Sequence, residues 1–269
     1  MSSPITSTTT QKTRPLALVT GASAGIGQSF ARLLARDGYD LVLVARDSMR
    51  LDVLAKQLEH EYGSQTEVLP ADLTKVDQLA VVEQRMGVNP PIDLLVNNAG
   101  FGTFGSFHEL PLDAEDREVR LNVLALMRLT HAAAGPMVAR GSGAILNVSS
   151  VAGSQPIPGN ATYAATKAFV TSFSEALHEE LRGTGVGVTV LCPGFTRTEF
   201  QERSGFEGGR VPVFMWQEPD DVATAALAAL AKGRTVCVPG SLNKVANAFS
   251  NATPHAITRR LAGSVIRRT

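Results

Sequence analysis

The sequence has few cysteines, no long apolar run and no secretion signal. Cys192 and Cys237 are the only cysteines among 269 residues, which excludes a disulfide framework and suits a reducing compartment. No segment approaches the ~18 consecutive apolar residues that a membrane-spanning helix needs. Residues 1–13 lack the apolar core of a signal peptide and are expected to form a flexible tail. These absences lead us to expect a soluble, cytoplasmic protein.

The chain also lacks an excess of either charge. Lys and Arg total 25, as do Asp and Glu, so net charge gives no reason to expect a nucleic-acid partner. From Val222 onward, however, seven basic residues and no acidic ones occur. Residues 241–269 are therefore expected to form a basic helical extension, with apolar residues at helical spacing among arginines (Ile257, Leu261, Val265; Arg259, Arg260, Arg267, Arg268). This extension either packs on its own domain or a neighbouring subunit, or contacts a membrane surface, an anionic partner or an acidic substrate carrier.

Short apolar runs alternate with longer helical stretches. Strands are expected over 15–20, 40–46, 67–73, 92–100, 143–150, 187–194 and 235–240. The main helices are expected over 25–36, from the end of the second strand to about 62, over 114–138 and over 161–181. This alternation predicts one α/β domain over residues 14–240, with a doubly wound, parallel, seven-stranded, Rossmann-like sheet and helices on both faces. Polar clusters follow each of the first six strands, so the ligand is expected at the carboxyl ends of the strands.

The segment "TGASAGIG", residues 20–27, has two interpretations. Ser23 between Gly21 and Gly25 matches the nucleophile elbow of a serine hydrolase. An elbow needs an oxyanion loop from an earlier strand, and Ser23 follows the first strand, so the hydrolase is a distant alternative. A phosphate cradle explains more residues, because Gly21 permits the turn, Gly25 lets the backbone approach a pyrophosphate and Gly27 allows close packing of the helix. The positive end of the helix would then face the phosphates.

The end of the second strand bears on which dinucleotide binds. An NAD site usually places a carboxylate here to accept from the ribose hydroxyls. Ala45 ends the strand, and Arg46 and then Asp47 follow it. The guanidinium of Arg46 would pair with the 2′-phosphate of NADP, and we therefore favour NADP. Asp47 leaves NAD as the alternative, and Arg46 as a solvated helix-start residue is the other interpretation.

Tyr163 and Lys167 lie four residues apart in "TYAATK" and share one face of an expected helix. A lysine ammonium beside a tyrosine lowers the pKa of the phenol from its ordinary value of about 10, which makes an acid/base pair. An ordinary helix face is the alternative.

Six motifs together resemble the short-chain dehydrogenase/reductase family of the single-domain type, which has a Rossmann-like fold. They are "TGASAGIG", "ADL", "NNAG", "LNV", "SS" with "YAATK", and "PGFTRT", in the order and spacing of the family between residues 15 and 240. Ala24 and Thr166 stand in place of the commoner serines of these motifs, which are small changes. Ala24 also means that no basic residue lies beside the glycines, so 2′-phosphate binding would depend largely on Arg46.

The resemblance implies roles for individual residues. Tyr163 would exchange a proton with the substrate oxygen, Lys167 would hold the nicotinamide ribose, and Ser150 would bind the substrate oxygen, with Ser149 structural. Asn122 would anchor a water of the proton relay; without the resemblance it would be a buried helix kink. The cofactor contacts implied are Gly21, Ser23, Gly25, Ile26, Gly27, Arg46, Asp72, Leu73, Asn98, Ala99, Gly100, Tyr163, Lys167, Pro193, Gly194, Thr196 and Thr198. The sequence shows no clustered set of metal ligands.

These observations lead us to expect an NADPH-preferring oxidoreductase that acts on a small-molecule carbonyl or alcohol, assembled as a homodimer or homotetramer. Aromatic residues between 195 and 218 favour a bulky hydrophobic ketone, aldehyde or secondary alcohol, and equally fit a core or oligomer contact (Phe195, Phe200, Phe206, Phe214, Trp216). A protein that senses NAD(P) without turnover is the alternative from another class.

Overall fold

The computed structural model describes residues 14–204 and 211–245. The expected N-terminal tail (1–13), Phe206 and most of the expected basic extension (246–269) lie outside the described residues. None of the described helices is long and apolar enough to cross a membrane.

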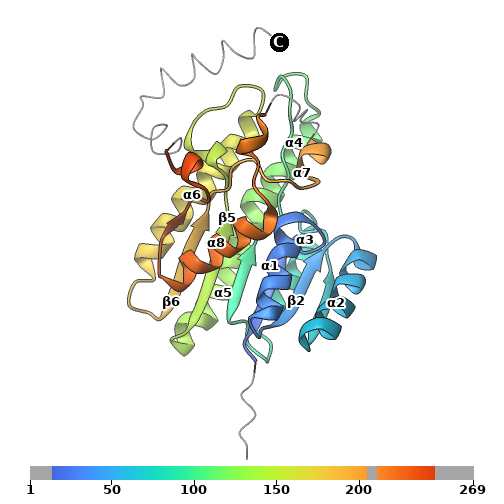
Figure 1. Ribbon diagram of the computed structural model, residues 1–269, viewed down its shortest axis with the longest axis vertical. Coiled ribbons are helices and arrows are strands. Elements are labelled where there is room, and N and C mark those ends of the chain that lie inside the picture. Colours follow the sequence, from blue (N-terminus) through green and yellow to red (C-terminus); the bar gives the residue numbers. More distant parts are fainter. Residues whose placement is uncertain (1–13, 205–210, 246–269) are drawn as a thin grey trace, which may run out of the picture.

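A seven-stranded sheet in which every strand pair is parallel forms the centre of the fold (Figure 1). Its order is β3-β2-β1-β4-β5-β6-β7. The strands are β1 (Leu16–Thr20), β2 (Asp40–Ala45), β3 (Thr66–Pro70), β4 (Leu94–Asn97), β5 (Gly143–Val148), β6 (Val186–Leu191) and β7 (Val236–Cys237). The order reverses between β1 and β4, which is where open α/β sheets bind ligands. The predicted doubly wound, Rossmann-like fold is confirmed.

Helices cover both faces of this sheet. They are α1 (Gly25–Arg36), α2 (Ser48–Tyr62), α3 (Val76–Arg85), α4 (Leu112–Val119), α5 (Leu126–Arg140), α6 (Ala161–Glu180), α7 (Phe200–Ser204) and α8 (Pro219–Ala231). One buried cluster joins α1, α2 and α8 to the sheet, and another joins α3 and α5 to the opposite face. Successive residues of β1 alternate between the two clusters, Ala17 in one and Leu18 in the other, because strand side chains alternate.

Several strands are shorter than predicted, such as β3, which ends at Pro70 rather than 73, and β7, which spans Val236–Cys237 rather than 235–240. Three further differences concern the site and the packing. The fourth strand ends at Asn97 rather than at 100, because the next residues turn toward the site. Helix α3 was not predicted, since apolar and polar residues are mixed over residues 76–85 and only Leu79 and Val82 are buried. The long helix expected over 114–138 is three segments, in which a π-helical turn, η1 (Arg120–Ala125), separates α4 from α5.

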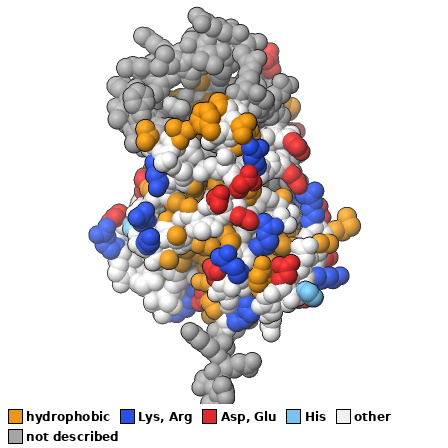
Figure 2. Space-filling view, in the orientation of Figure 1, with side chains coloured by type: hydrophobic (Ala, Val, Ile, Leu, Met, Phe, Trp, Pro, Cys, Tyr) orange, Lys and Arg blue, Asp and Glu red, His pale blue; other side chains and the backbone are white. Residues whose placement is uncertain are grey.

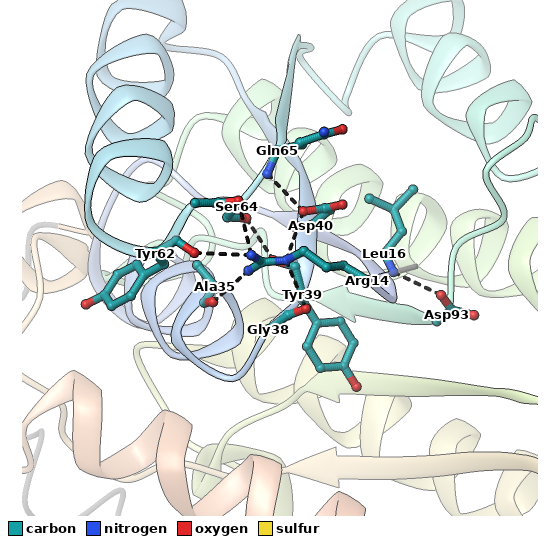
Figure 3. A network of polar contacts seen from close by, with 11 residues as sticks. Arg14, Leu16, Ala35, Gly38, Tyr39, Asp40, Tyr62, Ser64, Gln65 and Asp93 are labelled. Carbon is teal, nitrogen blue, oxygen red and sulfur yellow. Dashed lines mark hydrogen bonds and ion pairs between the residues drawn. The ribbon is translucent and has the colours of Figure 1, made fainter. Parts of the chain in front are cut away.

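Arg14 joins several segments of the amino-terminal half of the fold at the edge of the sheet opposite the carboxyl ends of the strands (Figure 3). Its guanidinium donates hydrogen bonds to backbone carbonyl oxygens where α1 and α2 end, which are those of Ala35, Gly38, Tyr39, Tyr62 and Gly63. The same side chain forms an ion pair of 3.2 Å with Asp40. A fixed cation at two helix C-termini offsets the partial negative charge of their unpaired carbonyl groups.

Candidate active site

Three glycines build the turn between β1 and α1. Gly21 and Gly25 have φ of +67° and +55°, a region that favours glycine. A Cβ on Gly27 would lie 2.2 Å from the carbonyl oxygen of Gly21, so only glycine lets the helix start against the turn. The Asn98 amide, after β4, donates to the carbonyl oxygens of Thr20 (2.9 Å) and Gly21 (3.3 Å). Asn98 therefore braces the turn.

The first turn of α1 offers backbone N–H groups to an anion. Its N-cap, Ala24, makes no side-chain cap hydrogen bond, and the first turn contains no acidic residue. Free N–H groups and the positive helix end together form a phosphate site. Ser23 lies half-buried in this turn, and Ile26 packs against the core. The residues present thus fit the pyrophosphate of a dinucleotide.

The two polar residues after β2 have different environments, since Asp47 caps a helix and Arg46 is exposed. Asp47 Oδ1 accepts a hydrogen bond of 3.0 Å from the backbone N–H of Arg50, so its carboxylate caps α2. Arg46 is exposed, and within the described ranges no hydrogen bond or ion pair engages its guanidinium. Burial acts to raise the pKa of Asp72, but hydrogen bonds from Thr74 and the charge of Arg46 outweigh it and lower that pKa. Arg46 and Asp72 therefore lie close together, with the buried Leu73 next in the chain.

Tyr163, Lys167 and Ser150 come together from α6 and from the turn that follows β5. The Tyr163 side chain hydrogen-bonds Ser150, and the Lys167 Nζ lies 5.6 Å from the Tyr163 ring centroid. Lys167 also donates to the carbonyl oxygen of Val148 at 2.9 Å. Neighbouring Ser149 is buried, and its hydroxyl donates to the Lys167 carbonyl oxygen at 2.7 Å. Ser149 therefore holds the helix, and Ser150 faces the tyrosine.

The expectation of an acidified tyrosine is wrong in this structure. Burial raises the pKa of Tyr163 to about 12, and the hydrogen bond with Ser150 only partly opposes this rise. Burial also lowers the pKa of Lys167 to about 8. Desolvation therefore acts on both groups in the direction of their neutral forms. The phenol keeps its proton at neutral pH.

Asn122 lies at 1% exposure in the π-helical turn η1. Its Oδ1 accepts from the backbone N–H of Phe101 at 3.1 Å, and its Nδ2 donates to the carbonyl oxygen of Phe101 at 2.8 Å and to Thr166 Oγ1 at 3.1 Å. A Cβ on Gly100 would lie 3.0 Å from Asn122 Oδ1 and 3.4 Å from Lys167 Nζ. The "NNAG" segment, including Ala99, therefore passes directly beside the asparagine and the lysine.

The sequence analysis missed two carboxylates beneath this site. Glu115 and Glu118 are 5% and 0% exposed. The Thr103 hydroxyl oxygen lies 2.5 Å from Glu115 Oε1 and 2.9 Å from Glu118 Oε2, so its one proton is shared between two carboxyl groups. Glu115 also accepts a hydrogen bond from Thr162. A signal was present, because Glu118 precedes Asn122 by four residues and so lies on the same helix face.

The segment after β6 covers the glycine turn. A Cβ on Gly25 would lie 2.8 Å from the methyl carbon of Thr198, and the buried Thr196 bonds the carbonyl oxygen of Gly194, next to Pro193. Phe200 lies 5.5 Å from Tyr163, centroid to centroid. Phe195 instead packs against Trp216, and Phe214 is 76% exposed. Of the predicted aromatics, Phe200 thus contacts the tyrosine.

Other chemistry receives no support from the described residues. No hydrogen bond there joins Ser23 to a histidine. Across residues 14–204 and 211–245, no group of three or more His, Cys, Asp or Glu is placed to hold a metal ion.

Comparisons with known proteins agree with this geometry. A family model described as short chain dehydrogenase matches residues 15–206. A solved short-chain dehydrogenase from Sphingobium yanoikuyae in complex with NADPH is 42% identical, with a TM-score of 0.81 over 84% of this chain and 88% of that chain. A bulky-bulky ketone specific alcohol dehydrogenase from Comamonas testosteroni is 37% identical, with a TM-score of 0.78 over 88% and 91% of the two chains.

Curated relatives are longer than the region they share with this chain. A ketoacyl reductase from Nostoc sp. is 37% identical over 66% of this chain and 62% of its own length. A very-long-chain 3-oxoacyl-CoA reductase from Bos taurus is 35% identical over 68% of this chain and 60% of its own length. The match therefore spans about three fifths of these relatives. With the family model covering residues 15–206, we conclude that the chain belongs to the short-chain dehydrogenase family.

Proposed function

We propose that this protein is an NADP(H)-dependent oxidoreductase that interconverts a carbonyl and an alcohol. The observation that carries the proposal is the meeting of Ser150, Tyr163 and Lys167 at the carboxyl ends of the strands, close to an uncapped helix N-terminus. A sensor that only binds a dinucleotide needs the glycine turn but has no use for a hydrogen-bonded Ser–Tyr pair. Turnover therefore explains more of the site than sensing does.

The chain's own residues divide the work of the reaction. Bound NADPH supplies the hydride. Ser150 hydrogen-bonds the carbonyl oxygen and stabilises the charge that develops on it. Tyr163 donates the proton to that oxygen in reduction, which suits a phenol that keeps its proton at neutral pH. Lys167 holds the ribose and provides the nearby positive charge, while Asn122 fixes the segment at Phe101 that faces the lysine.

NADP is favoured over NAD by the residues after β2. Asp47 caps α2 through Oδ1 and pairs with Arg50 through Oδ2 at 3.5 Å, so both of its oxygens already have partners on its own helix. Arg46 is exposed and, among the described residues, unengaged. A guanidinium in this place matches the charge and geometry of a 2′-phosphate. The relative from Sphingobium yanoikuyae was solved with NADPH, which supports the same choice.

The substrate is proposed to be a bulky hydrophobic ketone or the corresponding alcohol. Phe200 packs beside Tyr163, and the segments that follow β4 and β6 expose apolar side chains (Phe104, Phe107, Leu112, Val213, Phe214). Figure 2 shows hydrophobic side chains gathered along the upper edge of the described surface, on the side where the strands end. The printed names of relatives, a bulky-bulky ketone specific dehydrogenase and very-long-chain 3-oxoacyl-CoA reductases, point the same way.

The test is a panel of small and bulky ketones assayed with NADPH and with NADH, following the absorbance of the reduced nicotinamide. We expect faster turnover of bulky ketones with NADPH, and Tyr163→Phe should lose turnover while it still binds NADPH. NADPH binding without turnover of any ketone would favour the sensor. Acylation of Ser23 by a serine-reactive probe would favour the hydrolase.

A further inference from the structure

One buried carboxylate oxygen of Glu118 has no hydrogen-bond partner among the described residues. The side chain is 0% exposed. Its Oε2 accepts a hydrogen bond of 2.9 Å from the backbone N–H of Thr103 and lies 2.9 Å from the Thr103 hydroxyl, whose proton is shared with Glu115. Its Oε1 is buried and receives no hydrogen bond from any described residue. An unpaired buried carboxylate oxygen opposes folding, so this position calls for a reason other than stability.

The charged neighbours of Glu118 belong to its own helix and to α6. Glu115, one turn earlier, disfavours a second negative charge, whereas Lys167 favours it. In the other direction, the Glu118 charge favours the cationic form of Lys167 and disfavours the phenolate of Tyr163. The carboxyl is thus coupled to both members of the acid/base pair.

Backbone geometry links these groups. Thr103, which binds Glu118, lies two residues after Phe101, which binds Asn122. Gly100 lies against both Asn122 and Lys167. Residues 100–103 therefore connect the threonine that binds Glu118 to the glycine that lies against Lys167. Among the described residues no hydrogen bond joins Glu118 to Ser150 or Tyr163, whereas its charge acts on Lys167, so we assign its effect to the lysine.

We propose that Glu118 is a positioning residue of the reaction, whose buried carboxylate holds Lys167 as a cation and Tyr163 as a phenol around neutral pH. Burial lowers the pKa of Lys167 to about 8 even against the opposing charge of Glu118, so loss of that charge would bring the pKa closer to neutral. Burial likewise raises the pKa of Glu118 to about 7. Each charge opposes the neutralisation of the other. The catalytic meaning of this coupling rests on the proposed function, but the coupling itself does not.

The direct test is a pH titration of the Lys167 ammonium by ¹⁵N NMR in the ligand-free protein, with the signal assigned by its loss in Lys167→Met. In Glu118→Gln we expect the midpoint to fall by about one pH unit, a tenfold change in the protonation equilibrium. Glu118→Asp keeps the charge and should retain most of the wild-type midpoint. Glu115→Gln removes a neighbouring carboxylate that does not act on Lys167 directly, and should not lower it.

An unchanged midpoint in Glu118→Gln would overturn the proposal, as would an equal fall in Glu118→Asp. The wild-type protein gives a second check that needs no variant to fold. Its Lys167 signal should show two inflections, one of which follows the ¹³C signal of the Glu118 carboxyl. A single inflection independent of that carboxyl would also overturn the proposal.

Activity then separates this inference from the proposed function. On an accepted ketone, the high-pH limb of the kcat/KM profile should move to lower pH in Glu118→Gln by the same amount as the lysine midpoint. A shifted lysine with no ketone turnover in the wild type would sink the proposed function and leave the coupling standing. Robust ketone turnover with an unshifted Lys167 midpoint would support the proposed function and overturn the coupling.

Discussion

Arg50 and Glu199, 149 residues apart in the sequence, form a two-pronged ion pair beside the glycine turn. Arg50 Nη1 lies 2.9 Å from each carboxylate oxygen of Glu199. The pair joins the first turn of α2 to the segment after β6, and the preceding residue, Thr198, packs over Gly25. It therefore fastens this segment over the proposed cofactor site.

Breaking this pair should loosen the cofactor. Both side chains are nearly half exposed, so solvent screens the pair and its contribution is small. Glu199→Gln should therefore raise the NADPH dissociation rate by up to roughly fivefold, measured by stopped-flow fluorescence. The difference should shrink at high salt, which screens the wild-type pair. Glu202→Gln on α7 is the matched control, and equal rates at low salt for all three proteins would contradict the prediction.

Removing the Arg46 guanidinium should reduce the preference for NADPH. A charge-assisted hydrogen bond is worth about 1.5–3 kcal/mol, so Arg46→Gln should weaken NADPH binding by roughly 10- to 100-fold and leave NADH binding nearly unchanged. Calorimetric titration with both cofactors measures this. Lys56→Gln, a charge loss elsewhere on α2, controls for general electrostatics. If both cofactors weaken equally in Arg46→Gln, the guanidinium does not read the 2′-phosphate.

Glu118 should give the protein a characteristic pH dependence of stability. Its pKa is raised from 4.5 to about 7 in the folded state, so within that window the folded protein binds more protons than the unfolded chain. The free energy of unfolding therefore falls as pH rises through the window, by up to about 3 kcal/mol. Urea unfolding at about pH 5 and about pH 8 should show this loss reduced in Glu118→Gln. A variant with the same loss as the wild type would refute the raised pKa.

The Arg14 clamp should contribute measurably to folding. Arg14→Met leaves the carbonyl groups at the ends of α1 and α2 without their donor, and we expect a loss of about 2–3 kcal/mol in the free energy of unfolding. Arg14→Lys keeps the charge but has fewer hydrogen-bond donors, so its free energy of unfolding should lie between those of the wild type and Arg14→Met. Arg36→Met removes an exposed pair with Asp37 and should change stability by less than about 0.5 kcal/mol. A comparable loss from Arg36→Met would mean that the carbonyl contacts are not the cause.

The sequence predicts those features that depend on local pattern. Apolar runs such as residues 15–20 and the polar clusters after them identify the strands and the ligand edge, because buried parallel strands leave a simple periodic signal. The order Ala45-Arg46-Asp47 likewise suffices to raise the question of the cofactor.

Features that depend on contacts between distant segments could not be predicted in this way. Glu118 lies in the polar segment "LDAEDREV", which is typical of a solvated helix face, and it is buried by Thr103 from another loop. The raised pKa of Tyr163 has the same origin, since the spacing to Lys167 is visible in the sequence and the degree of burial is not. Helix α3 shows that a weakly apolar helix is also missed, because tertiary packing decides its formation.

The π-helical turn at Arg120–Ala125 lets one continuous helical segment direct different side chains inward before and after the turn. A π turn accommodates an extra residue, which rotates everything after it by about 100° relative to an uninterrupted α-helix. Before the turn, the inward side chains are carboxylates; after it, they are the apolar residues Leu126, Leu129 and Ala133. Deleting one residue there would restore regular winding and throw one half out of phase with its surroundings.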